Sequence, residues 1–334
     1  MEYEDTAIDF AAVHATHSQL SKDYYVDGAM GEGKAELMKS VSQLANNTAS
    51  LSSSAMLVKV NISKWEGRKH DKKASADIVA SNGAKRGAAN VHKRLLPNSD
   101  TLKAIVDHAS LMHRTHTRMT MPWADIGDRL LTTAQYMNYH NEMTALQNKF
   151  YALADTFHDD YVLEHAEAQV HLGDMYDPSD YPSAEELRDK FRCTISYSPL
   201  PESGDFRVDL PKEAIADLQT SYVNYYEEKT KRAMDDMWHR LYKVLDNMSG
   251  RLDYQSKEDK KKFNDTLVSN VTDMIDLLRV SNVTNSPQMS AMADQLEEAF
   301  VGVTPDALRE DDYFRAETKR AVDKAIASLP SLDI

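Results

Sequence analysis

Between residues 130 and 172 the apolar side chains recur at alternating intervals of three and four residues. The series begins with Tyr136, Tyr139, Met143, Leu146, Phe150, Leu153 and Phe157, and it continues with Tyr161, His165, Ala168 and Leu172. Alternating intervals of this kind form the apolar seam of a coiled coil. The pattern therefore predicts a helix of roughly forty residues, which at ~1.5 Å per residue is about 60 Å long.

A second long stripe follows Pro211 and runs to about Met248, with Lys229 interrupting it. Its apolar members are Ile215, Leu218, Tyr222, Tyr225, Met237, Leu241, Val244 and Met248. Two long stripes predict an antiparallel helical pair in which each helix buries the other. Between the stripes, residues 193–198 and 205–210 resemble two strands joined by a Pro/Gly loop, so we expect a small β-hairpin at the tip of this pair.

The rest of the chain predicts shorter elements. Residues 57–63 favour a strand, Ser99 or Asp100 begins a helix that runs to about Thr117, and residues 119–127 break the helical pattern. Further helices are expected at about 260–280, 287–300 and 305–328. The expected fold is mainly α, a long coiled-coil-like antiparallel pair with further helices and a small β-hairpin. We divide it into an N-terminal helical or flexible arm (1–56), a basic segment with a short strand and helices (57–128), the long hairpin with its β tip (129–250) and C-terminal helices (251–334).

Composition agrees with long helices and narrows the class of protein. The chain of 334 residues has only 11 Gly and 10 Pro, and its single cysteine, Cys193, excludes an intramolecular disulfide framework. The acidic N-terminus lacks the basic and apolar regions of a secretory signal, and no stretch approaches the ~18 consecutive apolar residues of a membrane span. These features predict a cytoplasmic protein without a membrane partner.

Charge is distributed unevenly along the chain, whose formal net charge is −14. Residues 59–94 carry ten Lys/Arg and three acids, whereas the other 298 residues carry 29 Lys/Arg and 50 acids. The candidate binding residues in this basic segment are Lys64, Trp65, Arg68, Lys69, Lys72, Lys73, Lys85, Arg86, Lys93 and Arg94. Cations beside an aromatic suit phosphate contact with base stacking. A +7 segment in an acidic chain also suits docking on an acidic face of its own fold or of a neighbouring subunit, the interpretation we favour, and the third interpretation is a solvated face.

Other candidate chemistry is weaker. The spacing of Gly28, Gly33 and Lys34 matches a phosphate-binding loop, but position 35 is Ala where a magnesium-binding hydroxyl is needed, so we interpret it as a flexible turn. Histidines at His113 and His116, and at His165 and His171, could meet on helix faces. The paired Glu-x-x-His motifs of a di-iron bundle are missing from the sequence. We therefore assign no catalytic residue, no metal site and no cofactor.

Four stretches carry a resemblance to a known family. They read VNISKWEGRK (60–69) with DKK (71–73), MPW (121–123) with GDRLL (127–131), DYPS (180–183), and DFRV (205–208). The sequence resembles a family of uncharacterised bacteriophage proteins defined as a domain of unknown function. The resemblance spans residues of about 57–280 and implies a phage origin and a helical body. Genes of that family often lie near a MoxR-type AAA+ ATPase and a von Willebrand A or cobaltochelatase-like protein, and the family supplies no catalytic residues.

These observations lead to an expected function. We expect a phage-encoded, non-enzymatic structural or interaction protein of the host cytoplasm, acting as a homo-oligomer or as the partner of an AAA+ ATPase module. The alternative is a nucleic-acid-binding protein of phage DNA metabolism that uses residues 59–94. A third hypothesis, a metal-dependent enzyme using the histidines, is the least favoured.

Overall fold

The computed structural model describes residues 51–200, 212–254 and 263–331. The chain divides into two units, Met1–Asn47 and Thr48–Ile334, and the described residues belong to the second. The four-part division at residues 56, 128 and 250 stays a prediction. The glycine-rich segment around Lys34 lies outside the described residues.

A four-stranded antiparallel sheet forms one part of this unit. Its order is β4-β5-β1-β6, with bounds Met121–Pro122 for β4, Arg129–Thr132 for β5, Ala55–Ser63 for β1 and Arg192–Pro199 for β6. The strand predicted at 57–63 is confirmed, and so is the one at 193–198. The second of these was expected to pair with residues 205–210, which lie outside the described residues. It pairs along its whole length with β1, from Met56 opposite Pro199 to Ser63 opposite Arg192.

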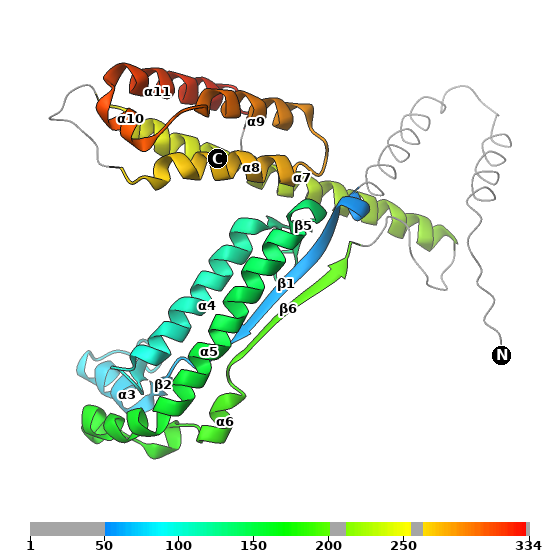
Figure 1. The fold of residues 1–334 in the computed structure, drawn as a ribbon. Helices are drawn as coiled ribbons and strands as arrows, with labels where there is room; N and C mark the ends of the chain where they lie inside the picture. Colours follow the sequence, from blue (N-terminus) through cyan, green and yellow to red (C-terminus); the bar gives the residue numbers. More distant parts are fainter. Residues whose placement is uncertain (1–50, 201–211, 255–262, 332–334) are drawn as a thin grey trace. The chain divides into compact units, whose positions relative to one another are not determined.

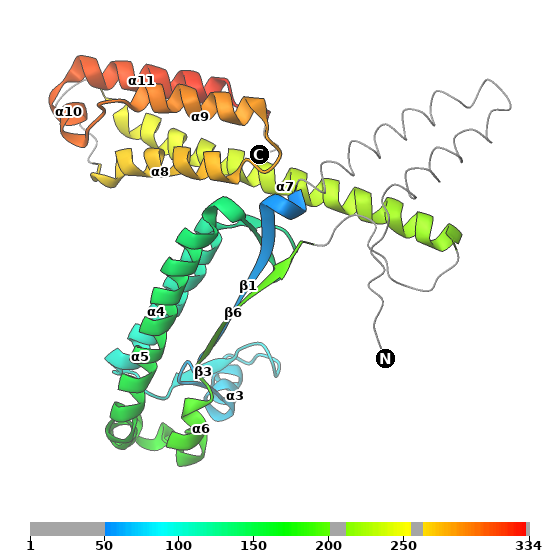
Figure 2. The same ribbon diagram turned by 45° about the vertical axis from the view of Figure 1, so that its right-hand side comes forward.

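Two helices lie side by side along this sheet, as Figures 1 and 2 both show. Helix α4 (Asp100–Met119) begins where the sequence predicts, because the Ser99 hydroxyl accepts a hydrogen bond from the Leu102 amide at 3.0 Å. Helix α5 spans Thr133–Leu172. Its predicted stripe is buried at Tyr139, Met143, Phe150, Phe157, Tyr161 and Ala168, in one core with side chains from α4, β1 and β6.

The long antiparallel pair is not confirmed, because each long helix has other partners. Helix α5 packs along α4, and the side chains from β1 and β6 in the same core leave its apolar stripe covered. Helix α7 (Lys212–Leu252) packs against α8 (Thr266–Ser281) and α11 (Asp312–Ala327). A periodic stripe fixes which face of a helix is buried but does not say which element buries it.

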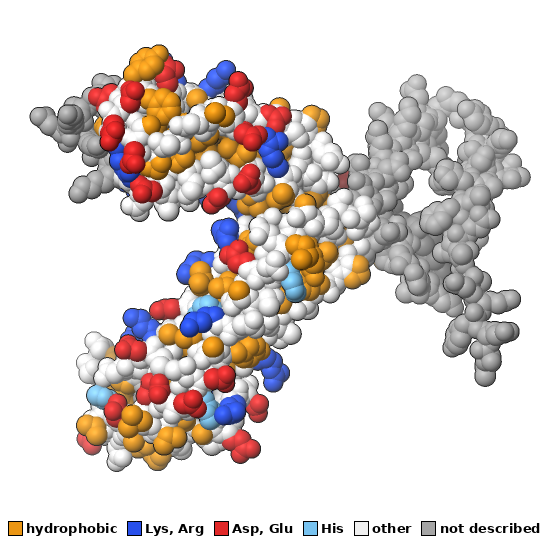
Figure 3. Space-filling view, in the orientation of Figure 1, with side chains coloured by type: hydrophobic (Ala, Val, Ile, Leu, Met, Phe, Trp, Pro, Cys, Tyr) orange, Lys and Arg blue, Asp and Glu red, His pale blue; other side chains and the backbone are white. Residues whose placement is uncertain are grey.

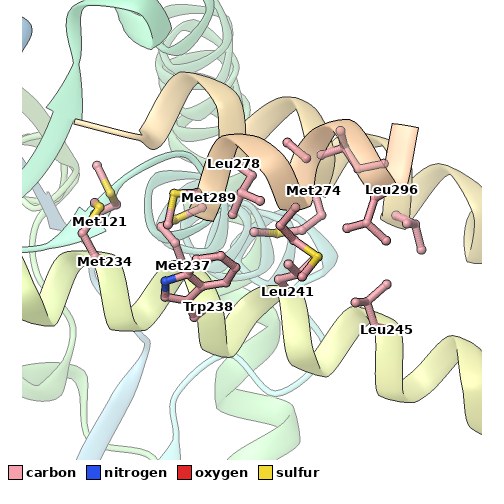
Figure 4. Close-up of a cluster of buried hydrophobic side chains, with 14 of the residues drawn as sticks. Met121, Met234, Met237, Trp238, Leu241, Leu245, Met274, Leu278, Met289 and Leu296 are labelled. Atoms are coloured by element: carbon pink, nitrogen blue, oxygen red, sulfur yellow. The ribbon is translucent and has the colours of Figure 1, made fainter. Parts of the chain in front are cut away.

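The helices α7 to α11 enclose a second core. Helix α9 spans Pro287–Phe300 as predicted, and the region predicted to be helical at 305–328 contains α10 (Pro305–Glu310) and α11. Figure 4 shows the core between α7, α8 and α9, where Met, Leu and Trp side chains interlock. Its labelled members are Met121, Met234, Met237, Trp238, Leu241, Leu245, Met274, Leu278, Met289 and Leu296.

The start of α5 corrects a boundary. The pattern placed the helix from Leu130, but Leu130 and Leu131 are fully buried in strand β5. The helix begins after Thr132, whose hydroxyl accepts a hydrogen bond from the Gln135 amide at 3.3 Å. Two adjacent leucines fit a helical stripe and a buried strand equally well, so the pattern alone could not separate them.

Basic residues 68–94 form a small element of their own. Strand β2 (Arg68–Asp71) leads into α3 (Lys72–Ser81), and β3 (Val91–Arg94) returns antiparallel to β2. The remaining short elements are the 3-10 turns η1 (Gly173–Met175) and η2 (Pro178–Asp180) and helix α6 (Ala184–Arg188). The predicted capping box of α6 is present, since Ser183 and Glu186 each bond the other's backbone amide.

Candidate anion-binding surface

The element β2–α3–β3, which we call the basic hairpin (residues 68–94), is positioned by tight local geometry. Gly67 precedes it with φ +60°, a conformation that favours glycine, and a Cβ atom there would lie 2.8 Å from the Leu102 side chain. The Leu95 amide donates to the Gly67 carbonyl at 2.7 Å and closes the strand pair. Asp71 caps α3 by accepting from the Ala74 amide at 2.9 Å.

One face of the β2–β3 pair docks on the rest of the chain through a single carboxylate. Lys69 lies opposite Lys93, and both ammonium groups approach Asp180, at 3.6 Å and 2.7 Å respectively. Lys93 also donates to the Met175 carbonyl at 2.6 Å. These two lysines therefore have a carboxylate partner within the same chain.

Trp65 is half-buried and packs against the core. Its ring stacks on Phe157 with centroids 6.1 Å apart and meets Tyr161 edge-on at 5.9 Å. Lys64 forms an ion pair with Glu66, and this contact lowers the pKa of the glutamate. These two candidates therefore have partners within the chain, and the ring face of Trp65 that lies on Phe157 is not free for a base.

Seven of the ten candidate residues remain exposed, and one of them, Lys69, pairs with Asp180. In the part of the chain that the structure describes, none of the other six has a carboxylate within ion-pairing distance: Arg68, Lys72, Lys73, Lys85, Arg86 and Arg94. Lys72 and Lys73 begin α3, whereas Lys85 and Arg86 lie between two glycines with positive φ, Gly83 and Gly87. The fold thus gathers them on one compact element.

A cavity of about 590 Å³ borders the hairpin, and its charge is mixed. Its lining includes the cations Arg68, Lys69 and Lys190 and the acids Asp180, Glu186 and Asp189. Because three acids offset three cations, this cavity is a poor site for a phosphate group. Of the six exposed cations without a carboxylate partner, Arg68 lines this cavity and the other five lie outside it, on the exposed parts of the hairpin.

The other candidate residues have structural partners. His116 is buried, with Nδ1 2.8 Å from the Tyr139 hydroxyl, and burial lowers its pKa to about 4. His165 stacks on Tyr181 at 4.2 Å, and burial raises the pKa of Cys193. Within the described ranges no three His, Cys, Asp or Glu side chains lie together as a metal site, and no helix is long and apolar enough to span a bilayer.

Sequence reasoning missed three parts of this surface. His70 and His92 lie opposite each other on β2 and β3 with ring centroids 5.4 Å apart, and Asp180 anchors the other face of the strand pair. The segment 68–71 is wholly polar, so no strand signal revealed that these residues pair across a sheet. Asp180 is more than 80 positions away in the sequence, and only its position in the stretch 180–183 drew attention to it.

The described residues thus form a mostly helical protein with a small antiparallel sheet and a basic hairpin. Comparison of the chain with protein-family models, curated protein sequences and solved structures gave no match. The resemblance to a phage family stays a prediction from the sequence.

Proposed function

We propose that this chain is a non-enzymatic interaction protein that binds an anionic macromolecular partner through the basic hairpin. The observation that carries the proposal is the set of six exposed cations without a carboxylate partner among the described residues. Clustered like charges bring no stability to the fold, but they raise the local potential and speed the encounter with an anionic surface.

In one form of the proposal, the partner is protein, either a second copy of the chain or an AAA+ ATPase module, in the cytoplasm of a phage-infected host. A second copy offers a complementary surface, because residues 264–330 contain twelve acidic and six basic side chains. The seam of α5 gives this form no support, since it is already buried against α4 and the sheet. Charge is therefore the stronger argument for assembly.

Sedimentation velocity at micromolar concentration tests this form. We expect association at low ionic strength that weakens as salt screens the charges. A pull-down from infected cells tests the ATPase arm of the proposal. A strict monomer at low salt, with no ATPase recovered, would remove protein partners from the proposal.

The second form, a nucleic-acid-binding protein of phage DNA metabolism, is favoured by a specific observation. The unpaired cations include arginines on adjacent strands, and the guanidinium group binds phosphate through two parallel hydrogen bonds. Retarded migration of DNA at low salt is the first measurement for this form.

A further inference from the structure

The two faces of the β2–β3 strand pair differ in what opposes their charge. Side chains alternate along a strand, so Arg68, His70, Arg94 and His92 share one face, while Lys69 and Lys93 share the other. The lysine face meets Asp180. The arginine–histidine face meets no carboxylate within ion-pairing distance in the described part of the chain.

The ring of His70, one of the two histidines on this face, is held by a hydrogen bond within the hairpin. The Ser75 hydroxyl donates to the Asp71 carbonyl at 2.6 Å and accepts from the Val91 amide at 2.9 Å. With its proton committed, Ser75 can only accept from His70 Nε2, 3.2 Å away, so Nε2 carries a hydrogen. The buried Ser75 thus joins both strands to α3 and fixes the ring of His70.

Placing Arg68 directly opposite Arg94 is unfavourable for the free protein, because like charges on paired strands repel. A ligand with closely spaced negative charges relieves that repulsion. Phosphodiester groups meet this requirement, and each arginine can bind a phosphate through two hydrogen bonds. Lys72, Lys73, Lys85 and Arg86 on the same element extend the positive charge beyond the strand pair.

The composition of the hairpin favours nucleic acid over an acidic protein. Protein interfaces depend on buried aromatic or apolar anchors and are depleted in lysine. In residues 68–94 the large exposed apolar side chain is Ile78, and the sequence there contains no Phe, Tyr or Trp. The surface is thus rich in phosphate-binding groups and poor in anchors for a protein.

The same composition favours double-stranded over single-stranded nucleic acid. Proteins that hold single strands stack bases on aromatic rings. The nearby Trp65 is packed on Phe157 and Tyr161, which leaves less of its ring for a base. Contacts to phosphates alone bind a duplex without reading its sequence.

We infer that the face formed by Arg68, Arg94, His70 and His92 binds the phosphodiester backbone of double-stranded DNA independently of sequence. This inference rests on the proposed function, that the basic hairpin takes an anionic partner. It adds the chemical class of that partner and the residues that hold it.

Fluorescence anisotropy of the full chain with labelled duplexes of about 20 base pairs, between about 50 and 200 mM salt, tests the inference. We expect binding to duplexes of unrelated sequence with equal affinity, weaker binding to a single strand of the same length, and a steep loss with salt. The double variant Arg68→Gln with Arg94→Gln should lower the affinity roughly tenfold or more and reduce the salt slope by about two.

The matched control removes two exposed cations from other elements, Arg114→Gln on α4 with Lys324→Gln on α11. It should retain nearly all of the affinity, and circular dichroism should show both double variants to be folded. Equal losses in the two double variants would overturn the assignment to this face. A preference for the single strand, or no duplex binding at about 50 mM salt, would overturn the inference itself.

Sedimentation of the same proteins separates this inference from the proposed function. If Arg68→Gln with Arg94→Gln abolishes self-association while DNA does not bind, the hairpin is a docking site for protein and the DNA inference is wrong. If neither DNA nor a protein partner responds to the double variant, both the inference and the proposed function are wrong.

Discussion

Most cations of the C-terminal helices are paired with carboxylates, whereas most cations of the basic hairpin are not. Over α8–α11 Figure 3 shows acidic side chains interspersed with Lys and Arg. Five of the six cations at 264–330 have a carboxylate within 4.0 Å: Arg279, Arg309, Arg315, Lys319 and Arg320. In the hairpin, Lys69 and Lys93 have one, Asp180, which they share. A cation that is paired within the fold contributes to stability, whereas an unpaired one is available to a partner. The number of cations alone does not separate these two roles.

Replacing Trp65 by Ala tests whether this residue of the basic segment stabilises the fold. Of the changes considered, it should have the largest effect on the free energy of unfolding. We expect a loss of about 3 kcal/mol in the free energy of unfolding, because the ring packs on Phe157 and Tyr161. Urea unfolding measures the loss, and Trp65→Phe should recover most of it. If Trp65→Ala instead keeps full stability and loses DNA binding, the ring is a stacking platform after all.

Arg315 represents a cation that the fold requires. It is buried, its guanidinium lies 3.9 Å from the Tyr254 ring centroid, and it pairs with Asp312 at 2.7 Å. Arg315→Ala should cost about 2 kcal/mol of unfolding free energy, less than for a fully buried pair because Asp312 is exposed. The variant Arg86→Ala in the hairpin is the comparison, and it should unfold at the same urea concentration as the native chain.

His116 differs from both the paired and the unpaired cations, because burial keeps this basic group neutral. Its pKa is lowered to about 4 by burial and then by Arg129, whereas in an unfolded chain a histidine binds a proton below about 6.5. Between these values the unfolded state holds more protons, so stability should fall as the pH is lowered, by about 2 kcal/mol at pH 5. Unfolding at pH 7 and pH 5 should show this loss reduced in His116→Gln. An unchanged loss would assign it to other groups.

Asp180→Asn converts paired lysines into unpaired ones within the hairpin. The side chains of Asp180 and Lys93 are about a tenth exposed, so we expect a loss of about 1 kcal/mol in unfolding free energy. The hairpin also gains positive charge, so anion binding should strengthen and depend more steeply on salt. Weaker DNA binding in a folded Asp180→Asn protein would show that the lysine face, and not the arginine face, supplies the contacts.

Arg94→Thr should have the smallest effect and the opposite sign. Removing one of two opposed arginines relieves repulsion, so the unfolding free energy should rise by about 0.5 kcal/mol while DNA binding weakens. Arg279→Thr, which removes ion pairs to Asp294 and Glu297, should lower stability instead. A loss of stability in Arg94→Thr would mean that the arginine has a partner in the fold.

Local patterns predicted the helices well because capping and periodicity are local. Ser99 begins α4 and residues 287–300 form α9 as expected. Helix partners were not predictable, since the stripe of α5 is covered by α4 and the sheet through contacts far apart in the sequence. The candidate site divides in the same way. Clustered charge is visible in the sequence. The packing of Trp65 depends on a tertiary contact with Phe157, and the position of Arg68 opposite Arg94 depends on the register of β2 and β3, so neither could be predicted.

Cys193 has a practical consequence for testing these ideas. It is the only cysteine in the chain, it is 4% exposed within strand β6, and its thiol pKa is raised. A thiol that is both covered and protonated reacts slowly with maleimides. A second cysteine placed at exposed Ser81, at the end of α3, would therefore take a fluorophore or spin label almost alone, so the approach of DNA or of another copy to the hairpin could be followed without background from the native thiol.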